Sequence, residues 1–324
     1  MNKISWGIIG CGDVAEVKSG PAFQKCEHSE LLSVMRRDLE KAKDFASRHK
    51  VQHWTNQVHE ILNNPKINAV YIATPPSSHL DYALKALEAG KHVYLEKPMT
   101  LNLAEALQLE IALKTSKSKL VVAHYRRKLP LFLKVKELLD QNEIGNVQFA
   151  EIKLIQPNHD KLTVETPEDW RLNTEISGGG YFYDLAPHQL DLLIHFFGKP
   201  NQIDGFASGQ SNLHTTNTTV NGILKFNNNI HFQGVWAFNC EVGKRKDSCV
   251  IYGDEGVLEF SFFGDQLQLI TKTHRETFSF KNPKHVQQPM IQSAIHYFLE
   301  KEANPCSVTT GLEVMKIMEK FTKS

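Results

Sequence analysis

Cysteine is scarce in this sequence, and its arrangement excludes two kinds of site. Five cysteines occur among 324 residues, and they are scattered without a C-x-x-C pair or a histidine at ligand spacing. A disulfide framework needs paired cysteines, and a structural zinc site needs clustered Cys and His ligands. We therefore expect reduced thiols and no metal site.

The sequence also lacks an excess of charge and a long apolar run. Lys and Arg number 37 against 36 Asp and Glu, whereas nucleic acids and anionic membrane surfaces select a strong basic excess. No apolar run approaches the length of roughly 20 residues that crosses a bilayer, and the first residues lack a signal-peptide core. We expect a cytoplasmic globular protein of two domains, with no nucleic-acid or membrane partner.

The first glycines follow a short apolar strand, Lys3–Ile9, in the run Gly10-Cys11-Gly12-Asp13-Val14-Ala15. In this G-x-G-x-x-A pattern the first glycine permits a tight turn, and the second lets the backbone approach a pyrophosphate. The third position keeps the following helix close to the strand. The pattern is weak alone, but its place between a strand and a helix predicts a dinucleotide site. We expect that helix to break at Gly20-Pro21.

Two arginines, Arg36 and Arg37, follow the second expected strand, Leu31–Met35. NAD-binding proteins carry an acid here for the ribose 2′-hydroxyl. A guanidinium instead forks onto a phosphate, so Arg36 favours the 2′-phosphate of NADP(H). The alternatives are a solvated pair of charges, or an Arg36 that stacks on adenine and also admits NAD(H). We expect NADP(H) to be preferred, with NAD(H) possible.

Strands and helices alternate regularly through residues 1–124, which indicates βαβ units and a doubly wound parallel (Rossmann) sheet. Ligands bind such sheets at the carboxyl ends of the strands. We expect one edge to be lined by the residues at these ends, which are Gly12, Arg36, Thr74, Lys97 and His124.

Lys97 is the most notable of these residues. His92–Leu95 has the β-branched and aromatic content of a buried strand, and Pro98 ends it because proline cannot continue a sheet ladder. A lysine is thereby placed at a strand's carboxyl end. A lone lysine there is usually a solvated charge, but the neighbouring strand ends favour a functional role.

Residues 125–324 follow a different pattern, which predicts an α+β domain with a large, mostly antiparallel open sheet. A helix from Pro130 to Asp140 leads to a strand, Val147–Ile155, and six further strands follow, joined by Asn- and Gly-containing turns. The last helix is expected to pack back on the first domain. Further strands are expected at 202–208, 220–225, 230–238, 248–252, 256–261 and 267–271.

The segment Ser177–His195 carries acid and histidine at helical spacing after a triple glycine, which would let the backbone approach another group closely. Asp184 and His188 are four residues apart and share one helix face. Histidine can move a proton near neutral pH, and a neighbouring carboxylate fixes its tautomer. A core histidine is the alternative. Asp191 and His195 repeat the spacing deeper in the helix and are assigned a structural role.

These motifs together resemble the glucose–fructose oxidoreductase, inositol dehydrogenase and rhizopine catabolism (Gfo/Idh/MocA) family. The resemblance spans the chain and implies NAD(P)-dependent oxidation or reduction of hydroxyl groups on sugars, cyclitols and related small molecules. It rests on Gly10-x-Gly12-x-x-Ala15, Ala73-Thr74-Pro75, Glu96-Lys97-Pro98, Trp170-Arg171 and Gly178-Gly179-Gly180 followed by Asp184, His188 and Asp191.

The resemblance also implies roles for individual residues. Lys97, Asp184 and His188 would be catalytic, with His188 as general acid/base and Lys97 polarising the substrate oxygen. Cofactor contacts would come from the glycine loop with Arg36, Arg37, Thr74, Pro75, His79, Glu96, Lys97 and Arg126. Substrate contacts would come from Lys97, Arg126, Trp170, Arg171, Tyr181, Asp184 and His188. Two positions depart from the family pattern, because Arg36 replaces an acid and His124 replaces an Asn.

Three further expectations remain open at this point. A dinucleotide-binding regulator without turnover would use the same fold, and so would hydrolysis by an NAD-dependent elimination route. We expect a homodimer or homotetramer, because a sheet with helices on one side leaves a wide open face. The candidates for that face are His231, Gln233, Val235, Ala237 and Asn239.

Overall fold

The computed structural model describes residues 2–157, 170–209, 216–240 and 245–323. They form two compact units: Met1–Arg126 with Pro283–Met315, and Arg127–Asn282 with Lys316–Ser324. The sequence led us to divide the chain after residue 124 and to assign residues 125–324 to one domain whose last helix packs back on the first. The structure groups residues 283–315, which include the start of that last helix, with the first unit.

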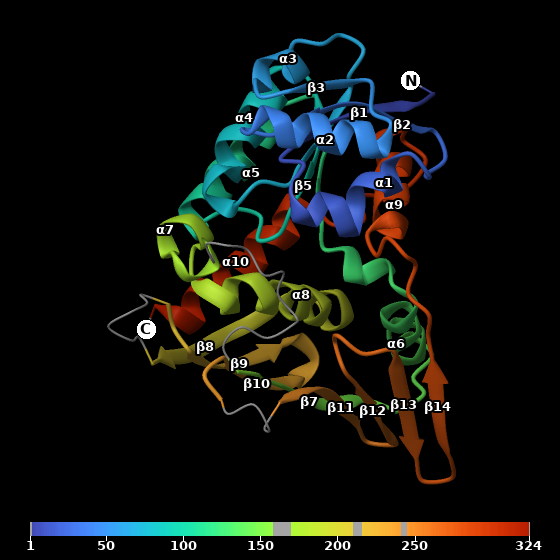
Figure 1. Cartoon of the computed structure of the whole chain (residues 1–324). Coiled ribbons are helices and arrows are strands. Elements are labelled where there is room, and N and C mark those ends of the chain that lie inside the picture. The colour runs from blue at the N-terminus through green and yellow to red at the C-terminus, as the bar shows by residue number, and fades with distance from the viewer. Residues whose placement is uncertain (1, 158–169, 210–215, 241–244, 324) are drawn as a thin grey trace. The chain divides into compact units, whose positions relative to one another are not determined.

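The first unit contains a six-stranded parallel sheet with the order β3-β2-β1-β4-β5-β6 (Figure 1). Its inner strands β1 and β4 are fully buried, because helices cover both faces of a doubly wound sheet. The strand bounds are β1 Ile4–Ile9, β2 Ser29–Met35, β3 His53–Thr55, β4 Ala69–Ile72, β5 His92–Leu95 and β6 Leu120–Val122.

Side-chain caps fix where two helices of this unit begin. Asp38 accepts a hydrogen bond from the Lys41 amide at 3.1 Å, and Asn102 accepts one from the Glu105 amide at 3.0 Å. Such caps satisfy amides that a helix start leaves unpaired. The helices are α1 Gly20–Phe23, α2 Leu39–His49, α3 Val58–Leu62, α4 His79–Glu88, α5 Leu103–Thr115 and α9 Gln288–Phe298, with the start of α10 Val308–Thr322.

An aromatic cluster explains why α9 belongs to the first unit. The Phe298 ring of α9 lies 5.8 Å from Trp6 of β1 and stacks on His92 of β5 at 5.0 Å between ring centroids. Trp6 in turn lies 4.8 Å from Phe23. Each fully buried aromatic side chain removes a large apolar area from water. The hydrophobic core of the Rossmann unit is therefore completed by Phe298, 176 positions after its last strand ends at Val122.

The second unit contains an eight-stranded sheet with the order β14-β13-β12-β11-β7-β10-β9-β8. Neighbouring strands are antiparallel except β7 and β10, which are parallel. The mostly antiparallel sheet is confirmed, but the sequence analysis missed β14. The strands are β7 Val147–Ile155, β8 Pro200–Ser208, β9 Thr219–Phe226, β10 His231–Ala237, β11 Lys246–Gly253, β12 Gly256–Phe260, β13 Gln266–Thr271 and β14 Arg275–Ser279.

One face of this sheet is covered by helix α8 (Gly180–Phe197). The indole Nε1 of Trp236 on β10 donates to Gln189 of α8 at 2.5 Å, and Phe182 packs edge-on against the same indole at 5.2 Å. The ring of Phe321 on α10 occupies the place of a side chain at Gly222, where a Cβ would lie 2.1 Å from it. The other helices of the unit are α6 Pro130–Asp140, α7 Thr174–Ser177 and the end of α10.

The opposite face of the sheet carries exposed side chains. Three of the large exposed hydrophobic residues lie there, Phe206 (63%), Ile223 (56%) and Tyr252 (37%). His231 and Gln233 are exposed as expected, whereas Ala237, at the end of β10, is only 7% exposed.

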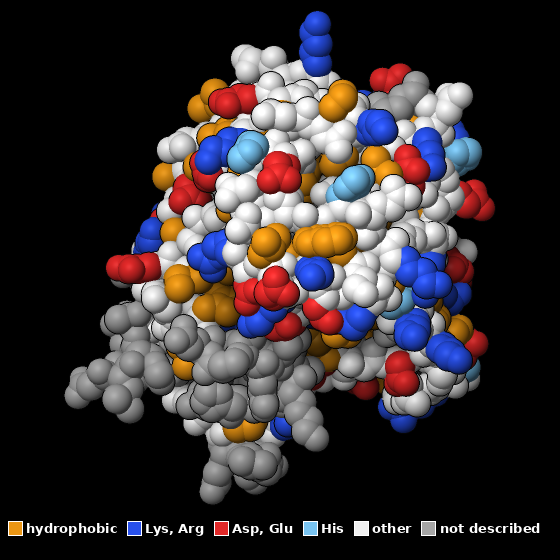
Figure 2. Space-filling view, turned by 45° about the horizontal axis from the view of Figure 1, so that its top comes forward, with side chains coloured by type: hydrophobic (Ala, Val, Ile, Leu, Met, Phe, Trp, Pro, Cys, Tyr) orange, Lys and Arg blue, Asp and Glu red, His pale blue; other side chains and the backbone are white. Residues whose placement is uncertain are grey.

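Among the described residues, no helix is both long and apolar enough to span a bilayer. Acidic and basic side chains are mixed on the face shown in Figure 2, as the balance of 37 basic and 36 acidic residues suggests.

Candidate functional site

The glycine loop after β1 has the shape that a pyrophosphate needs. Gly10 has φ 96°, and a Cβ there would lie 2.9 Å from the Ala73 carbonyl, so no other residue fits. A Cβ at Gly12 would meet nothing within 4 Å, which leaves open space over the loop. The following helical turn, Ala15–Ser19, is a π-helix, and α1 (Gly20–Phe23) continues directly from it, so the expected break at Gly20-Pro21 is wrong and the irregularity lies just before these residues. These features fit a bound dinucleotide.

Arg36, which follows β2, lies against the glycine loop. Its guanidinium donates to the Cys11 carbonyl at 3.4 Å, while the neighbouring Arg37 is exposed. The nearest following acid, Asp38, caps α2, and the Lys41 amide keeps the pKa of Asp38 below its usual value. The Asp38 carboxylate caps α2, so the charge that lies next to the glycine loop is the positive charge of Arg36.

Two strand-end loops are joined by His79, which has no exposed surface. Its ring nitrogens lie 2.8 Å from the Thr74 carbonyl and 2.9 Å from the Pro98 carbonyl. Burial lowers the pKa of His79, although both carbonyls act in the opposite direction. We expected His79 to contact a cofactor. The structure places it beneath the Thr74-Pro75 and Lys97-Pro98 loops, where it supports both.

Glu96 is likewise buried and holds the backbone before Lys97. It accepts hydrogen bonds from the Tyr71 hydroxyl at 2.6 Å, the Gln287 amide at 2.5 Å and the backbone N–H of Lys97 at 3.1 Å. Burial, followed by the Glu96 charge, raises the pKa of Tyr71 well above its usual value. A carboxylate with three donors is well satisfied, so Glu96 positions Lys97 from within the core.

Tyr125 follows β6 and was not identified from the sequence. Its side chain is 4% exposed, and the Arg126 guanidinium lies 5.6 Å from its ring. Burial acts to raise the pKa of Tyr125, but the charges of Arg126, Lys18 and Lys97 outweigh it and lower that pKa. The run of basic residues that follows Tyr125 is the sequence signal that could have drawn attention to it. His124, next to it, is 1% exposed.

In the second unit, helix α8 carries the candidate acid and histidine. Asp184 accepts a hydrogen bond from Arg171 at 2.8 Å, and the Arg171 guanidinium lies 4.7 Å from the Trp170 ring. His188, one turn further along α8, is 3% exposed. Tyr181 in the first turn is 5% exposed. Five expected substrate residues therefore lie on the first half of α8 or next to it, namely Trp170, Arg171, Tyr181, Asp184 and His188.

The triple glycine has a structural explanation. Gly178 caps α7 at φ 86°, and Gly180 begins α8 at φ 75°. A Cβ at Gly179 would lie 2.2 Å from the Tyr183 ring, so glycine lets that ring pack on the turn. The sequence led us to expect that the glycine backbone approaches another group closely. In the structure that group is a neighbouring side chain of the same protein.

Asp191 and His195 have the structural roles expected for them. Arg127 donates twice to Asp191, at 2.8 and 2.7 Å, and this pair is buried. Burial, followed by the Arg127 charge, lowers the pKa of His195 to about 4. The buried bidentate pair of Arg127 and Asp191 holds α8 in place. We assign neither Asp191 nor His195 a role in proton transfer.

Comparison with known proteins identifies both parts of the chain. Residues 4–124 match a family model described as the oxidoreductase family with an NAD-binding Rossmann fold. Residues 132–259 match the GFO/IDH/MocA C-terminal domain.

Individual relatives agree with this. Oxidoreductase P35 of Formosa agariphila is 50% identical over 99% of this chain and 98% of its own. The scyllo-inositol 2-dehydrogenase (NADP⁺) IolW of Bacillus subtilis is 30% identical over 65% of this chain, which spans 56% of that enzyme. A levoglucosan dehydrogenase solved with NADH and levoglucosan has a TM-score of 0.85 at 21% identity, covering 98% of this chain and 96% of its own.

Proposed function

Because the chain belongs to the Gfo/Idh/MocA family of oxidoreductases, we propose that it moves hydride between a nicotinamide cofactor and a hydroxyl-bearing carbon of a sugar, cyclitol or related small molecule. The NAD(P)-binding Rossmann domain and the oxidoreductase relatives establish the enzyme class. The observation that carries the substrate proposal is the joint presence of Lys97 at a strand end and Asp184 and His188 on α8.

The first unit holds the cofactor in this proposal. The glycine loop with Asp13, Val14 and Ala15 binds the pyrophosphate, while Arg36 binds the adenosine ribose. Thr74, Pro75 and Arg126 complete the contacts. His79 and Glu96 act from beneath, because both are buried and hold the two loops. The nicotinamide, when bound, supplies or accepts the hydride.

In this proposal, side chains of the protein itself move the proton and stabilise the charge on the substrate oxygen. His188 takes the proton from the substrate hydroxyl during oxidation and returns it during reduction. The Lys97 ammonium stabilises the negative charge that develops on the same oxygen. Asp184, fixed by its ion pair with Arg171, orients the substrate. Trp170, Tyr181 and Arg126 complete the expected substrate contacts.

The direct test of this function is turnover. Purified protein with NADP⁺ should reduce the cofactor in the presence of at least one member of a panel of sugars and cyclitols, measured by absorbance. Consumption of NADPH with the matching keto compounds should show the reverse reaction. Cofactor binding without turnover on any substrate would instead identify a dinucleotide-binding regulator.

We propose that NADP(H) is preferred and predict that Arg36→Asp reverses this preference. A charge-assisted bond to a 2′-phosphate is worth about 1.5–3 kcal/mol, or about ten- to a hundredfold in affinity. The aspartate would repel that phosphate and accept bonds from the ribose hydroxyls. Calorimetric titration with NADP⁺ and NAD⁺ measures both affinities.

Arg37→Asp is the matched control for this prediction, because Arg37 is exposed, whereas the Arg36 guanidinium donates to Cys11 of the glycine loop. It should change the preference much less. Equal affinity of the wild-type protein for both cofactors would show that Arg36 does not read the phosphate.

We further propose a homo-oligomer formed through the open face of the eight-stranded sheet. Phe206, Ile223 and Tyr252 expose apolar surface there, and monomers seldom leave such a patch uncovered. Light scattering at micromolar concentration should give a mass of at least twice 36.8 kDa. Ile223→Lys should shift the mass toward one chain, whereas a wild-type mass of one chain would contradict the proposal.

A further inference from the structure

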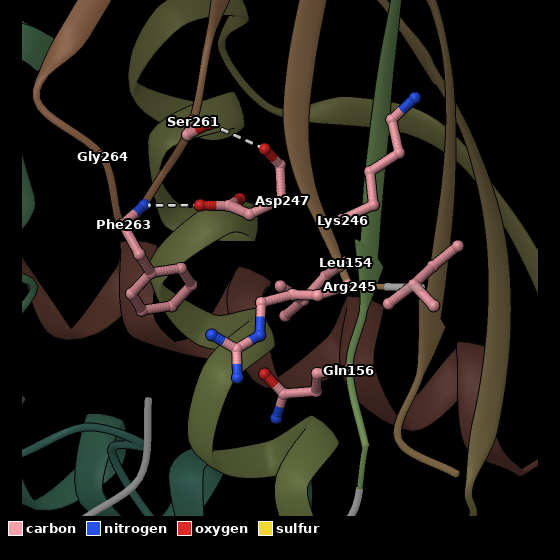
Figure 3. Close-up of a pocket in the computed structure, with 9 residues that line it drawn as sticks. Leu154, Gln156, Arg245, Lys246, Asp247, Ser261, Phe263 and Gly264 are labelled. Carbon is pink, nitrogen blue, oxygen red and sulfur yellow. Dashed lines mark hydrogen bonds between the residues drawn. The ribbon is translucent and has the colours of Figure 1, made fainter. Parts of the chain in front are cut away.

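A cavity of about 260 Å³ opens at the end of strands β7 and β11, within the second unit. Its lining includes Leu154, Gln156, Arg245, Asp247, Ser261 and Phe263, and we call it the β7–β11 pocket (Figure 3). It is smaller than the sites of about 300–1,000 Å³ that hold drug-sized ligands. The size suits a molecule no larger than a monosaccharide.

Strand register brings Gln156 and Arg245 together. Lys246 of β11 pairs with Ile155 of β7 in an antiparallel ladder, so the next residues outward, Arg245 and Gln156, face one another. They continue the side of the sheet that carries Leu154, which is 1% exposed. Figure 3 shows the guanidinium and the carboxamide extending in the same direction, with Lys246 extending the opposite way.

Gln156 presents a buried acceptor that the described protein leaves unsatisfied. The side chain is 1% exposed, and no described residue donates a hydrogen bond to its Oε1. Its backbone is held, because its N–H donates to the Ala237 carbonyl at 2.9 Å and its carbonyl accepts from Cys240 at 3.4 Å. Buried polar groups without partners are rare and costly. A ligand hydroxyl would supply the missing donor.

The positive charge of Arg245 suits a ligand with a single negative charge. Asp247 lies on the same side of the sheet and contributes one negative charge, whereas Lys246 extends the opposite way. The Asp247 carboxylate already accepts from the backbone amides of Phe262 at 3.2 Å and Phe263 at 2.8 Å, so its charge stays fixed beside the pocket. A guanidinium matches a carboxylate geometrically, whereas a dianionic phosphate would meet stronger repulsion from Asp247.

The pocket is close to the start of α8. Gln156 is hydrogen-bonded to Ala237, and the next residue, Phe238, has its ring 5.9 Å from that of Tyr181. Tyr181 and Asp184 share the first turns of α8. A molecule held in the pocket therefore lies at the same end of the second unit as the residues expected to contact substrate.

We propose that the β7–β11 pocket binds the carboxylate end of a sugar acid. Arg245 pairs with the carboxylate, Gln156 Oε1 accepts a hydrogen bond from a hydroxyl, and Phe263 offers an apolar surface beside the ring. The inference rests on the proposed function in one respect, which is that the bound sugar acid is taken to be the substrate. Binding itself requires no turnover.

The test is calorimetric titration of the NADPH-loaded full chain, so that a hydroxyl substrate is not oxidised. D-glucuronate and D-galacturonate should bind at least about tenfold more tightly than D-glucose and D-galactose, as expected for one charge-assisted pair. Arg245→Gln should abolish that difference, since Arg245 is exposed and its replacement leaves the core intact. Lys246→Gln, which removes the same charge from the other side of the strand, should preserve it.

Three results would overturn the proposal: equal binding of acidic and neutral sugars, tighter binding of D-glucose 6-phosphate than of D-glucuronate, or an unchanged preference in Arg245→Gln. The outcome is separable from that of the proposed function. Turnover of neutral sugars together with equal binding of acidic and neutral sugars would refute the pocket assignment and keep the oxidoreductase. Binding of uronates that depends on Arg245, without turnover of any sugar, would do the reverse.

Discussion

Replacing Lys97 by methionine should lower kcat by about 10²–10³-fold, the usual cost of removing one donor to a developing oxyanion. The affinity for NADP(H) should stay nearly unchanged, because the pyrophosphate is held by the glycine loop. The substitution keeps the backbone in place, since Glu96 holds the main-chain N–H of Lys97 at 3.1 Å from inside the core. Steady-state kinetics with calorimetry of cofactor binding measures both quantities.

Lys85→Met is a suitable control for this experiment. Lys85 is half exposed on α4 and pairs with Asp81 at 2.8 Å, so its loss should leave kcat and cofactor affinity as they are. An exposed ion pair of this kind contributes at most about 1 kcal/mol to stability. If Lys97→Met turned over at the wild-type rate, Lys97 would have no part in the chemistry.

Replacing His188 by alanine should lower kcat by about 10²–10⁴-fold, the range that a positioned general acid or base contributes. A proton must leave or join the substrate oxygen as hydride moves, and the buried His188 on α8 is the group proposed to carry it. An interaction used only in the transition state changes kcat and kcat/KM together. The affinity for NADP(H) should again be nearly unaffected.

His195→Ala provides the matched control on the same helix. Burial, followed by the charge of Arg127, lowers the pKa of His195 to about 4, so it stays neutral near pH 7 and cannot serve as a proton shuttle there. Its replacement should leave kcat almost unchanged. Equal losses in the two variants would show that the effect comes from a disturbed helix and not from proton transfer.

Elements with strong local signals were well predicted. The bounds expected for α6, β5 and β7 are those observed. Each is specified within a few residues of itself, by the proline that begins α6, by the proline that follows Lys97, or by an alternation of apolar residues. The parallel sheet in the first half and the mostly antiparallel sheet in the second half followed from the same signals.

Weak local signals account for what was missed. Strand β14, with the sequence RETFS, is mostly exposed and lies at the edge of its sheet, so it lacks the apolar alternation that marks a half-buried strand. The place of α9 in the first unit depends on where Phe298 packs, which is decided by residues far away in the chain. The roles of His79 and Glu96 as buried supports were hidden for the same reason.

By itself, the sequence determined the two kinds of sheet, the dinucleotide loop and the identity of Lys97, Asp184 and His188 as candidates. These features depend on residue type and short-range spacing, and both can be read from the sequence without knowing how distant segments pack. Only the tertiary structure decided that Arg36 contacts the glycine loop, that Arg171 holds Asp184, and that Gln156 faces Arg245. Each of these depends on strand register or on burial, and burial controls whether a polar group is satisfied by water or must find a partner.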